Sequence, residues 1–436
     1  MEQKEWQKTL RVIADLHVHS RYSRATSKKM NIDEITHFAR VKGLNLVGTG
    51  DFTHPRWLKE LNENLVKVPN TGLYKPVKDV ESPVHCMITG EVCTIFPFEG
   101  QVKKIHHVLL TPSLEIAVQI NERLARYGSL TVDGRPILDA TASQLVEEVL
   151  EVSDDNVVIP AHAWTPWFSI FGAFSGFNRV EDCYQDMTRH IFALETGLSS
   201  DPPMNWRLST LDRFALISNS DSHSAWPWRI GREANVFELE RLTYFEVVGA
   251  IRKRDGRFKF TIETNPAYGK YHWTGHRNCN VSLSPQEAIT LRGICPVCRK
   301  ELTKGVEQRV EELADRPAGF RPESAVGYKH LLPLSEIIST LLEVTYPGVQ
   351  KVWKVYNALV ERFGNEYAVL VDAPMEEMCE IVDPKIAEAI VRVREGNVKI
   401  IPGYDGVYGQ LALFEREKER MLQKRTVDQR SLSEFV

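Results

Sequence analysis

The sequence has few of the features that secreted and membrane proteins depend on. It has only seven cysteines in 436 residues, no run of about 18 apolar residues, and no signal-peptide pattern in its first five residues, Met1 to Glu5. Three of the cysteines cluster in one short segment, which points to a metal site rather than to disulfides. We therefore expect a cytoplasmic protein that does not enter a membrane.

A large excess of one charge is also missing. The formal net charge is -4, which argues against a chain that binds nucleic acid over its whole surface. A local basic groove is still possible, because an acidic metal site would offset it in the sum. Hydrophobic residues make up 43% of the chain, so two or three domains can each bury a core, and one of them should be large.

Short apolar runs alternate with helix-like stretches through the first half of the chain. The runs predict buried strands at residues 12–14, 44–47, 87–88, 107–110, 157–159, 191–194 and 215–217. Helical patterns lie between them, for example at 33–42 and 143–152. This alternation predicts a parallel sheet with right-handed crossovers, and about seven strands indicate an α/β barrel.

Histidines and carboxylates follow several of these predicted strands. They are Asp15-Leu16-His17-Val18-His19, then Glu91, then Asp221-Ser222-His223. His17 and His19 are two residues apart on a strand, so both side chains point to the same face. Carboxylate oxygens and imidazole nitrogens suit Mn²⁺, Fe²⁺, Zn²⁺ or Mg²⁺, and bridging carboxylates let two or three ions lie together. Polar residues at strand ends are the alternative, but three such sites at barrel strand ends favour a metal centre that acts on a phosphate.

The segment from Asp15 to Ser20 resembles the first motif of the PHP (polymerase and histidinol phosphatase) family. Later motifs of that family resemble Gly50-Asp51, Gly90-Glu91, Ile105-His106-His107, Ala161-His162 and Ser220-Asp221-Ser222-His223. The resemblance covers about residues 10–240 and implies a distorted seven-stranded (β/α) barrel, which we place at residues 1–262. It implies a centre of two or three divalent ions (Zn, Mn, Mg or Fe) with catalysis centred on Asp221, Glu91 and His223. The ligands it implies are His17, His19, Asp51, Glu91, His107, His162, Asp221 and His223.

Two departures from the family pattern argue against a third bound ion. The acidic residue that often follows the first motif is missing from Tyr22-Ser23-Arg24, and Phe52 follows Asp51 where the family usually has histidine. His54 could replace that ligand. Two further residues are open: His106 is expected to support a ligand or to pack in the core, and Glu195 could be a ligand, an orienting base or a structural residue.

The clustered cysteines have the spacing of a zinc site. His276-x2-Cys279 is followed, after fifteen residues, by Cys295-x2-Cys298. Four ligands with no open position indicate one structural zinc, which we place in a module at residues 263–312. His272 competes with His276 as the fourth ligand, and free cysteines are the alternative. Several arginines and lysines of this segment could form ion pairs with backbone phosphates of a nucleic acid.

An aromatic segment, residues 164–177, follows the predicted ligand His162. It contains two tryptophans and four phenylalanines with Gly172, Ser175 and Gly176 among them. Such a loop suits base stacking or a pocket for an extruded base, whereas an aromatic core under a loop is the alternative. The predicted base contacts are Phe171, Phe174, Ser175 and Asn178.

The whole arrangement resembles the endonuclease Q family. The residues that carry this resemblance are the PHP motifs, the zinc module from Tyr271 to Cys298, and a helical region, 313–409, that ends in Ile401-Pro402-Gly403-Tyr404-Asp405-Gly406-Val407-Tyr408-Gly409. That family, from archaea and some bacteria, consists of DNA repair nucleases. The resemblance implies nicking 5′ of deaminated bases (uracil, hypoxanthine, xanthine) and of abasic sites, which leaves a 3′-hydroxyl and a 5′-phosphate. The alternatives are a PHP phosphoesterase for a small molecule or nucleotide, and a DNA-binding scaffold without catalysis.

The last segment, residues 410–436, predicts a tail that binds a partner. Its end reads Q-x-x-L-x-x-F-V, with Gln429, Leu432, Phe435 and Val436 at the fixed positions. This pattern resembles the peptide that docks on the sliding clamp PCNA, and the polar residues before it would act as a tether. A polar tail with stray apolar residues is the alternative. We expect the protein itself to be a monomer.

Overall fold

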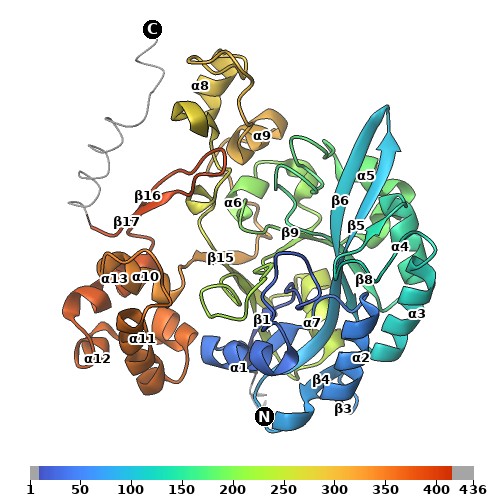
Figure 1. Ribbon diagram of the computed structural model, residues 1–436, viewed down its shortest axis with the longest axis horizontal. Coiled ribbons are helices and arrows are strands. Elements are labelled where there is room, and N and C mark those ends of the chain that lie inside the picture. Colours follow the sequence, from blue (N-terminus) through green and yellow to red (C-terminus); the bar gives the residue numbers. More distant parts are fainter. Residues whose placement is uncertain (1–8, 415–436) are drawn as a thin grey trace, which may run out of the picture.

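The protein was analysed as a computed structural model, which describes residues 9–414 as a mixed α/β structure around one large sheet (Figure 1). The strand order along this sheet is β15-β12-β11-β1-β2-β5-β4-β3, and β6, β7 and β8 continue it from β5. The strands are β1 (Leu10–Asp15), β2 (Leu46–Gly48), β3 (Leu65–Val68), β4 (Leu73–Pro76), β5 (His85–Phe98), β6 (Gln101–Thr111), β7 (Ile137–Leu138), β8 (Val157–Pro160), β11 (Ala234–Leu239), β12 (Phe258–Glu263) and β15 (Gly327–His330). A separate parallel pair is formed by β9 (Ala193–Glu195) and β10 (Ala215–Ile217).

Every predicted strand segment falls wholly or in part within a strand of the structure, but the expectation of a wholly parallel sheet is wrong. β1, β2 and β5 pair in parallel, whereas β5 and β6 form a long antiparallel hairpin and β1 pairs antiparallel with β11. The hairpin forms because Glu99 and Gly100 both adopt positive φ, which gives a turn too short for a helical crossover. The seven-stranded count of the barrel stays a prediction.

The β9–β10 pair and the segment after it are joined by backbone hydrogen bonds to the segments that follow β8 and β1. The Ala163 amide donates to Glu195 at 2.9 Å, and the His19 amide donates to Ser222 at 2.9 Å. The polypeptide that follows β10 therefore returns to the end of β1, where the first predicted ligands lie.

Helices cover the outside of the sheet (Figure 1). They are α1 (Ile32–Lys42), α2 (Pro55–Asn64), α3 (Leu114–Leu124), α4 (Ala142–Leu150), α5 (Val180–Tyr184), α6 (Pro202–Asn205) and α7 (Tyr244–Lys253). In α1 the buried residues Ile32, Ile35 and Ala39 recur at helical spacing, the Asn31 side chain caps the first turn, and Gly43 ends the helix in the left-handed conformation. The predicted helices at 33–42 and 143–152 are confirmed in α1 and α4.

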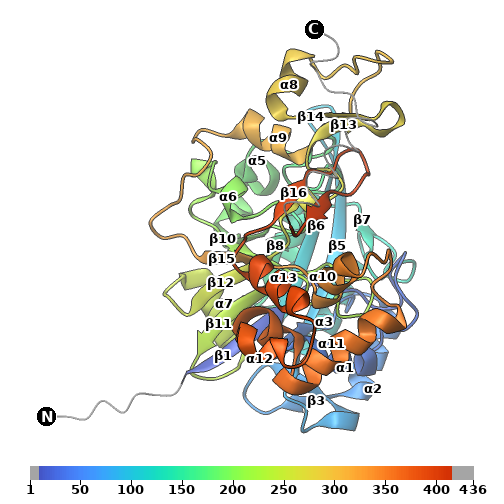
Figure 2. The ribbon, with the colours of Figure 1, turned by 90° about the vertical axis from the view of Figure 1, so that its left-hand side faces the viewer.

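The second half of the chain forms two further groups of elements (Figure 2). One contains β13 (Thr274–His276), β14 (Val281–Leu283), α8 (Pro285–Thr290) and α9 (Val306–Leu313). The other contains α10 (Leu334–Leu341), α11 (Gln350–Phe363), α12 (Met375–Cys379) and α13 (Pro384–Arg394), followed by the hairpin of β16 (Lys399–Ile401) and β17 (Gln410–Ala412). Within the predicted helical region, β15 pairs with β12, so this region also contributes a strand to the main sheet.

A buried ion pair joins the helical group to α1. The Lys42 ammonium lies 2.7 Å from Glu366 and also donates to the Pro227 carbonyl at 2.9 Å. Tyr356 donates to the second Glu366 oxygen at 2.8 Å. Both charged side chains are almost fully buried, and a buried pair is tolerated only when its geometry is well satisfied. The contact therefore fixes the helical group beside the loop that follows Asp221 and His223.

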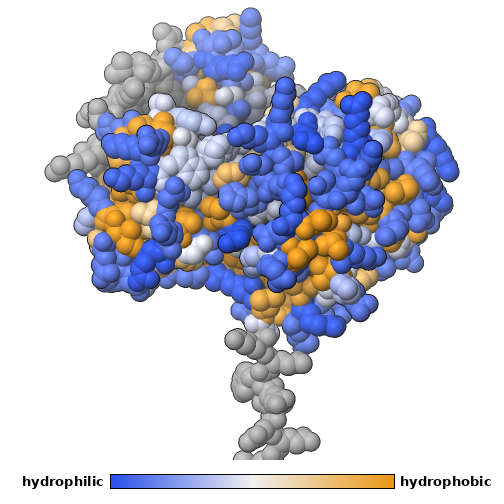
Figure 3. All heavy atoms as spheres, turned by 60° about the horizontal axis from the view of Figure 1, so that its bottom comes forward, coloured by the Kyte–Doolittle hydropathy of each residue, from blue (hydrophilic) through white to orange (hydrophobic). Residues whose placement is uncertain are grey.

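The surface is mixed in character. On the face in Figure 3 hydrophilic residues predominate, and hydrophobic residues gather in separate patches. Among residues 9–414, no helix combines the length and the apolar character that crossing a bilayer requires.

Candidate metal centre

Histidines and carboxylates from distant parts of the chain meet at two adjoining positions. One ligand atom each of His17, His19, Glu91 and Asp221 lie within 4.8 Å of one another, and Glu91, His106 and His162 form a second group by the same measure. Glu91 belongs to both groups. A carboxylate shared between two sets of nitrogen and oxygen ligands is the arrangement expected of a centre for two divalent ions.

Two further carboxylates hold the outer ring nitrogens of the first pair of histidines. Glu195 lies 3.0 Å from His17 Nδ1, and Asp51 lies 2.9 Å from His19 Nδ1. Such partners fix the tautomer and direct Nε2 inward. The inward Nε2 of His17 is buried without a hydrogen-bond partner, and it lies 3.6 Å from Asp221 and 3.7 Å from Glu91. An unpartnered imidazole nitrogen beside two carboxylates fits a divalent cation.

The charges of this centre depend on one another. Burial opposes the charged form of His17, but the carboxylates of Glu195 and Glu91 outweigh it and raise the pKa of His17 well above its usual value. Burial likewise opposes ionisation of Glu91, but His106, Arg135 and His17 hold its pKa well below the usual range. Each charge is therefore stabilised by an opposite charge and not by water.

The backbone is strained at several residues of the centre. Asp51, His162 and Asp221 have φ of 49°, 30° and 48°, a region that non-glycine residues rarely occupy. Asp15 holds the loop that carries Asp221, because its carboxylate accepts from the Ser220 amide at 3.1 Å and from the Gly231 amide at 2.8 Å. Strain of this kind persists only where the surroundings enforce it, and it is concentrated at functional sites.

The structure does not bring His107 into the centre, and His106 takes its place. In the β5–β6 hairpin Cys93 pairs with His106 and Val92 pairs with His107. Alternation along the strands therefore puts His106 on the face of Glu91 and His107 on the opposite face. His107 instead lies 2.9 Å from the Thr94 hydroxyl and 2.7 Å from the Tyr184 hydroxyl. The resemblance implied His107 as the ligand, and only the strand register shows that the adjacent His106 lies beside Glu91 instead.

Two other expected ligands, Asp51 and His223, and two possible ones, Glu195 and His54, lie around the centre rather than in it. Asp51 and Glu195 reach the histidines and not the inner group, so Glu195 has the orienting geometry among the roles left open for it. The His223 ring lies 4.3 Å from the His19 ring and is partly exposed at the edge. His54 stacks on Tyr22 at 4.4 Å, so within the described residues it does not join either group.

A cleft of about 540 Å³ opens beside the second group. His106, His162 and Asp221 line its inner end. Seven further lining residues are cationic or aromatic: Arg24, Arg135, Trp167, Phe168, Lys270, Tyr271 and Tyr408. The Arg135 guanidinium is 3.4 Å from Glu91. Trp167 and Phe168 had a signal in the sequence, since they belong to the aromatic segment 164–177, and Tyr408 belongs to the segment 401–409 that carries the endonuclease Q resemblance.

Three of the four predicted base contacts have structural roles. Phe171 is fully buried against Trp164, the Ser175 hydroxyl accepts from the Phe168 amide at 3.1 Å, and the Asn178 side chain accepts from Arg309 at 2.7 Å. Phe174 is 49% exposed but lies outside the cleft. Phe171 and Ser175 are thus used in packing and in hydrogen bonds within the loop, Asn178 is exposed and paired with Arg309, and the expected contact with an extruded base stays a prediction.

The predicted zinc ligands are brought together as a set. His276, Cys279, Cys295 and Cys298 place one ligand atom each within 4.8 Å of one another. His276 is the last residue of strand β13, and its Nδ1 lies 3.3 Å from the Cys298 sulfur. His272 instead faces Glu307 at 3.3 Å, which resolves the alternative in favour of His276. The donor set of three sulfurs and one nitrogen fits a closed tetrahedral zinc site.

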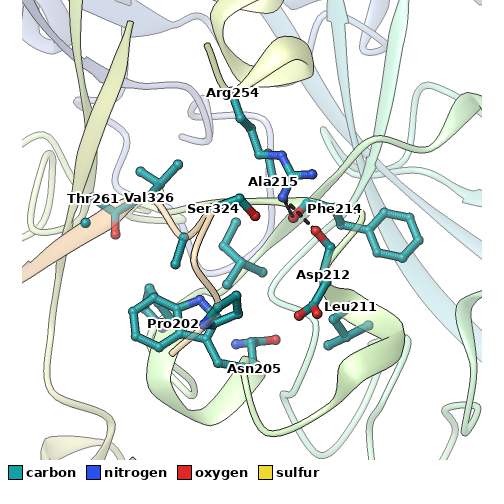
Figure 4. Close-up of a pocket in the computed structure, with 15 residues that line it drawn as sticks. Pro202, Asn205, Leu211, Asp212, Phe214, Ala215, Arg254, Thr261, Ser324 and Val326 are labelled. Carbon is teal, nitrogen blue, oxygen red and sulfur yellow. Dashed lines mark hydrogen bonds between the residues drawn. The ribbon is translucent and has the colours of Figure 1, made fainter. Parts of the chain in front are cut away.

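Another cavity of the protein is a packing void rather than a site (Figure 4). It encloses about 30 Å³ between α6, Phe214 and the segment leading into β15. Arg254 crosses one side and donates to the Asp212 carbonyl at 2.7 Å. None of the ligand groups described above lines it. Its volume is that of a water molecule or little more, so it does not compete with the cleft as a candidate site.

Sequence comparisons match the chain to two proteins. A family model described as the MJ0043 C-terminal domain matches residues 333–397. The uncharacterized protein MJ0043 of Methanocaldococcus jannaschii is 32% identical over 298 residues, which cover 64% of this chain and 35% of that protein. The chain therefore spans about a third of that relative's length. The uncharacterized protein YqxK of Bacillus subtilis is 28% identical over 414 residues, which cover 92% of this chain and 99% of YqxK.

Structure comparisons match nearly the whole chain. The lesion-specific endonuclease PfuEndoQ from Pyrococcus furiosus superposes with a TM-score of 0.83 at 33% identity, covering 97% of this chain and 100% of that one. A complex of endonuclease Q with a 27-mer duplex substrate that has an abasic lesion at the active site gives a TM-score of 0.82 at 34% identity, covering 93% and 98%.

Proposed function

The chain belongs to the endonuclease Q family, and on that premise we propose that it is a metal-dependent DNA repair endonuclease that nicks 5′ of deaminated bases (uracil, hypoxanthine, xanthine) and of abasic sites, leaving a 3′-hydroxyl and a 5′-phosphate. One observation carries the proposal. Glu91 joins two ligand groups at the inner end of a cleft whose walls are cationic and aromatic. This combination suits a phosphodiester attached to a nucleobase.

The proposed centre holds two divalent ions, with Zn, Mn, Mg or Fe as candidates and a third ion as a possibility. His17, His19, Glu91 and Asp221 would hold one ion, and Glu91, His106 and His162 the other. When bound, such ions activate water and neutralise charge that develops on a phosphate. Asp51 and Glu195 keep His17 and His19 in the tautomer that presents Nε2 inward.

The cleft residues have distinct proposed tasks. Arg135, Arg24 and Lys270 can pair with phosphate oxygens, which positions the backbone without reading sequence. Trp167, Phe168 and Tyr408 offer aromatic faces to unstacked bases. A nucleotide whose base is missing or mispaired leaves the stacked duplex more easily than a correctly paired nucleotide. This difference would contribute part of the selectivity.

Two further parts of the protein have proposed partners. One structural zinc would be held by His276 and the three clustered cysteines, and it would support a basic surface beside the DNA. The expected clamp contact through Gln429, Leu432, Phe435 and Val436 lies outside the described residues. We propose it on the sequence alone.

A nicking assay tests the proposed function. Each labelled duplex would contain a single lesion, which is uracil, hypoxanthine or an abasic site, and a control duplex would contain only normal bases. All would be incubated with and without Mg²⁺ or Mn²⁺. We expect one metal-dependent cut immediately 5′ of the lesion and none in the normal duplex. Hydrolysis of a small phosphate ester without nicking would favour the phosphoesterase alternative, and salt-sensitive binding without nicking would favour a scaffold.

A further inference from the structure

The loop between Trp164 and Phe177 divides its aromatic side chains into two sets. Trp164 and Phe171 are buried and pack on each other, with ring centroids 4.7 Å apart. Trp167 and Phe174 stack in parallel at 5.0 Å with an angle of 11°, yet they are 41% and 49% exposed. The first set anchors the loop. The second set leaves an exposed stacked pair, which a core does not require.

This exposed pair begins in the cleft and extends beyond it. Trp167 lines the cleft of the metal centre, whereas Phe174 lines a neighbouring pocket with Arg292 and Lys304 of the zinc module. The Tyr271 ring meets Trp167 edge to face at 5.3 Å. We call Trp167, Phe174 and Tyr271 the aromatic platform. Its position makes it continuous with the proposed substrate site but offset from the ligands.

The loop that carries Trp167 and Phe174 is held from two sides. Arg309 of α9 donates to the carbonyls of Phe171 and Phe177, both at 3.1 Å, and Lys103 of β6 donates to the Gly176 carbonyl at 2.7 Å. The same loop turns through Phe168, which has φ of 60° and whose carbonyl accepts from the His106 amide at 3.0 Å. A bulky residue in this conformation is a strained exception. This turn places the Phe168 ring 5.0 Å from the His106 ring.

We propose that the aromatic platform binds a nucleobase of the lesion strand next to the lesion nucleotide, and not the lesion base itself. The inference rests on the proposed function. If the scissile phosphate lies at the metal centre, the lesion nucleotide occupies the cleft, and the platform leads away from it toward the zinc module. Extrusion of one nucleotide deprives its neighbour of a stacking partner, and an aromatic side chain can replace that partner for any base.

Substitution of the platform separates binding from chemistry. Trp167→Ala should raise the KM for a lesion duplex by about 10-fold, the loss expected for one base–aromatic stack, and leave kcat nearly unchanged. Trp167→Phe should retain most of the binding. Phe245→Ala, which removes a 53% exposed aromatic residue of α7, is the matched control and should behave as wild type. A fall in kcat with unchanged KM would overturn the proposal.

A fluorescent purine analogue then locates the base that stacks. It would be placed at the lesion position, or at the neighbouring position on either side, and binding would be measured in full-length protein with a chelator present. We expect quenching at one neighbouring position, lost in Trp167→Ala and kept in Phe245→Ala. Trp167-dependent quenching at the lesion position alone would assign the platform to the lesion base and refute the inference. Wild-type protein that neither binds nor nicks the lesion duplex would refute the proposed function, whereas normal nicking with no effect of Trp167→Ala would refute only the platform.

Discussion

The protein builds its two candidate metal sites in opposite ways. The four predicted zinc ligands lie between residues 276 and 298, on a hairpin and a short knuckle. The residues of the candidate catalytic centre lie between residues 17 and 221, and they meet only because the ends of β1, β8 and β10 come together beside the middle of the β5–β6 hairpin. The comparison shows that a local site follows from spacing, whereas a dispersed site depends on strand register.

The electrostatic surroundings of the two sites differ as well. In the catalytic centre buried carboxylates and histidines shift each other's pKa values, and Asp51 and Glu195 support the ligands from outside. The zinc group is partly exposed, and its sulfurs supply most of the donor set. We expect loss of a ligand to abolish chemistry in the first site and to unfold a module in the second. The following experiments test this contrast, from the largest expected effect to the smallest.

Asp221→Ala should have the largest effect on catalysis. Nicking should fall by more than about 100-fold, because even residues that only support a ligand contribute about 10- to 100-fold. DNA binding should persist, since the cationic cleft residues are unchanged. Nicking rates and gel-shift titrations measure the two properties, and wild-type turnover would remove Asp221 from the centre.

A pair of adjacent substitutions tests the strand register. His106→Ala should lower both activity and the content of divalent metal, with activity reduced by at least about 10-fold. His107→Ala should keep the metal and most of the activity, but it should lower the free energy of unfolding by about 1–3 kcal/mol because the buried Thr94 and Tyr184 hydroxyls lose their partner. Elemental analysis and denaturant unfolding distinguish the two variants. The reverse pattern would restore His107 as the ligand.

Cys295→Ser should affect the zinc module and spare the catalytic centre. Cys295 is fully buried among the ligands, so its loss should release one zinc and expose the module to proteolysis. The Kd for DNA should rise by roughly 10-fold if the module supplies a few phosphate contacts. Metal content, limited proteolysis and DNA titrations provide the readouts. Cys379→Ser, at a cysteine outside the ligand groups, is the control. Unchanged zinc content in Cys295→Ser would contradict the assignment.

Two buried carboxylates outside the metal centre, Glu233 and Glu263, are not balanced by opposite charges in the way that Glu91 is. Burial raises the pKa of Glu233 to about 8, and burial beside Glu233 raises the pKa of Glu263 well above its usual range. In both residues one buried carboxylate oxygen lacks a hydrogen-bond partner. These groups should therefore be protonated in the folded protein at a pH where Glu91 is ionised.

The stability of the protein should fall with pH because of Glu233. The folded state holds this proton more tightly than the unfolded state, so the contribution is complete below pH 4.5 and is lost progressively up to pH of about 8. The slope should approach about 1.4 kcal/mol per pH unit within that window. Glu233→Gln should remove this slope in denaturant unfolding at several pH values, and the exposed Glu240→Gln should not. Equal slopes in wild type and Glu233→Gln would contradict the prediction.

Deletion of residues 429–436 should have the smallest effect on nicking. The truncated protein should lose binding to the sliding clamp while its rate on a short lesion duplex stays within about two-fold of wild type, because the tail would act only through tethering. Surface plasmon resonance with immobilised clamp measures the first property. Clamp binding that survives the deletion would refute the proposed contact.

Sequence alone was sufficient wherever a pattern is local. Apolar runs located the strands, the Asn31 and Gly43 caps agree with the predicted first helix, and the Cys-x2-Cys spacing with His276 predicted four side chains that the structure brings together. These features depend on neighbours within a few residues, where helix periodicity, capping and knuckle geometry follow directly from the order of side chains.

Tertiary structure decided what depends on register and on loop conformation. A one-residue step along β6 separates His106 from His107, and a strand alternates its side chains between two faces. The burial of Phe171 and the exposure of Trp167 follow from turns that no periodic pattern describes. Arg135, Lys270 and Tyr408 reach the same cleft from three segments far apart in sequence. Sequence thus determined the types of ligand available, and folding selected which of them meet.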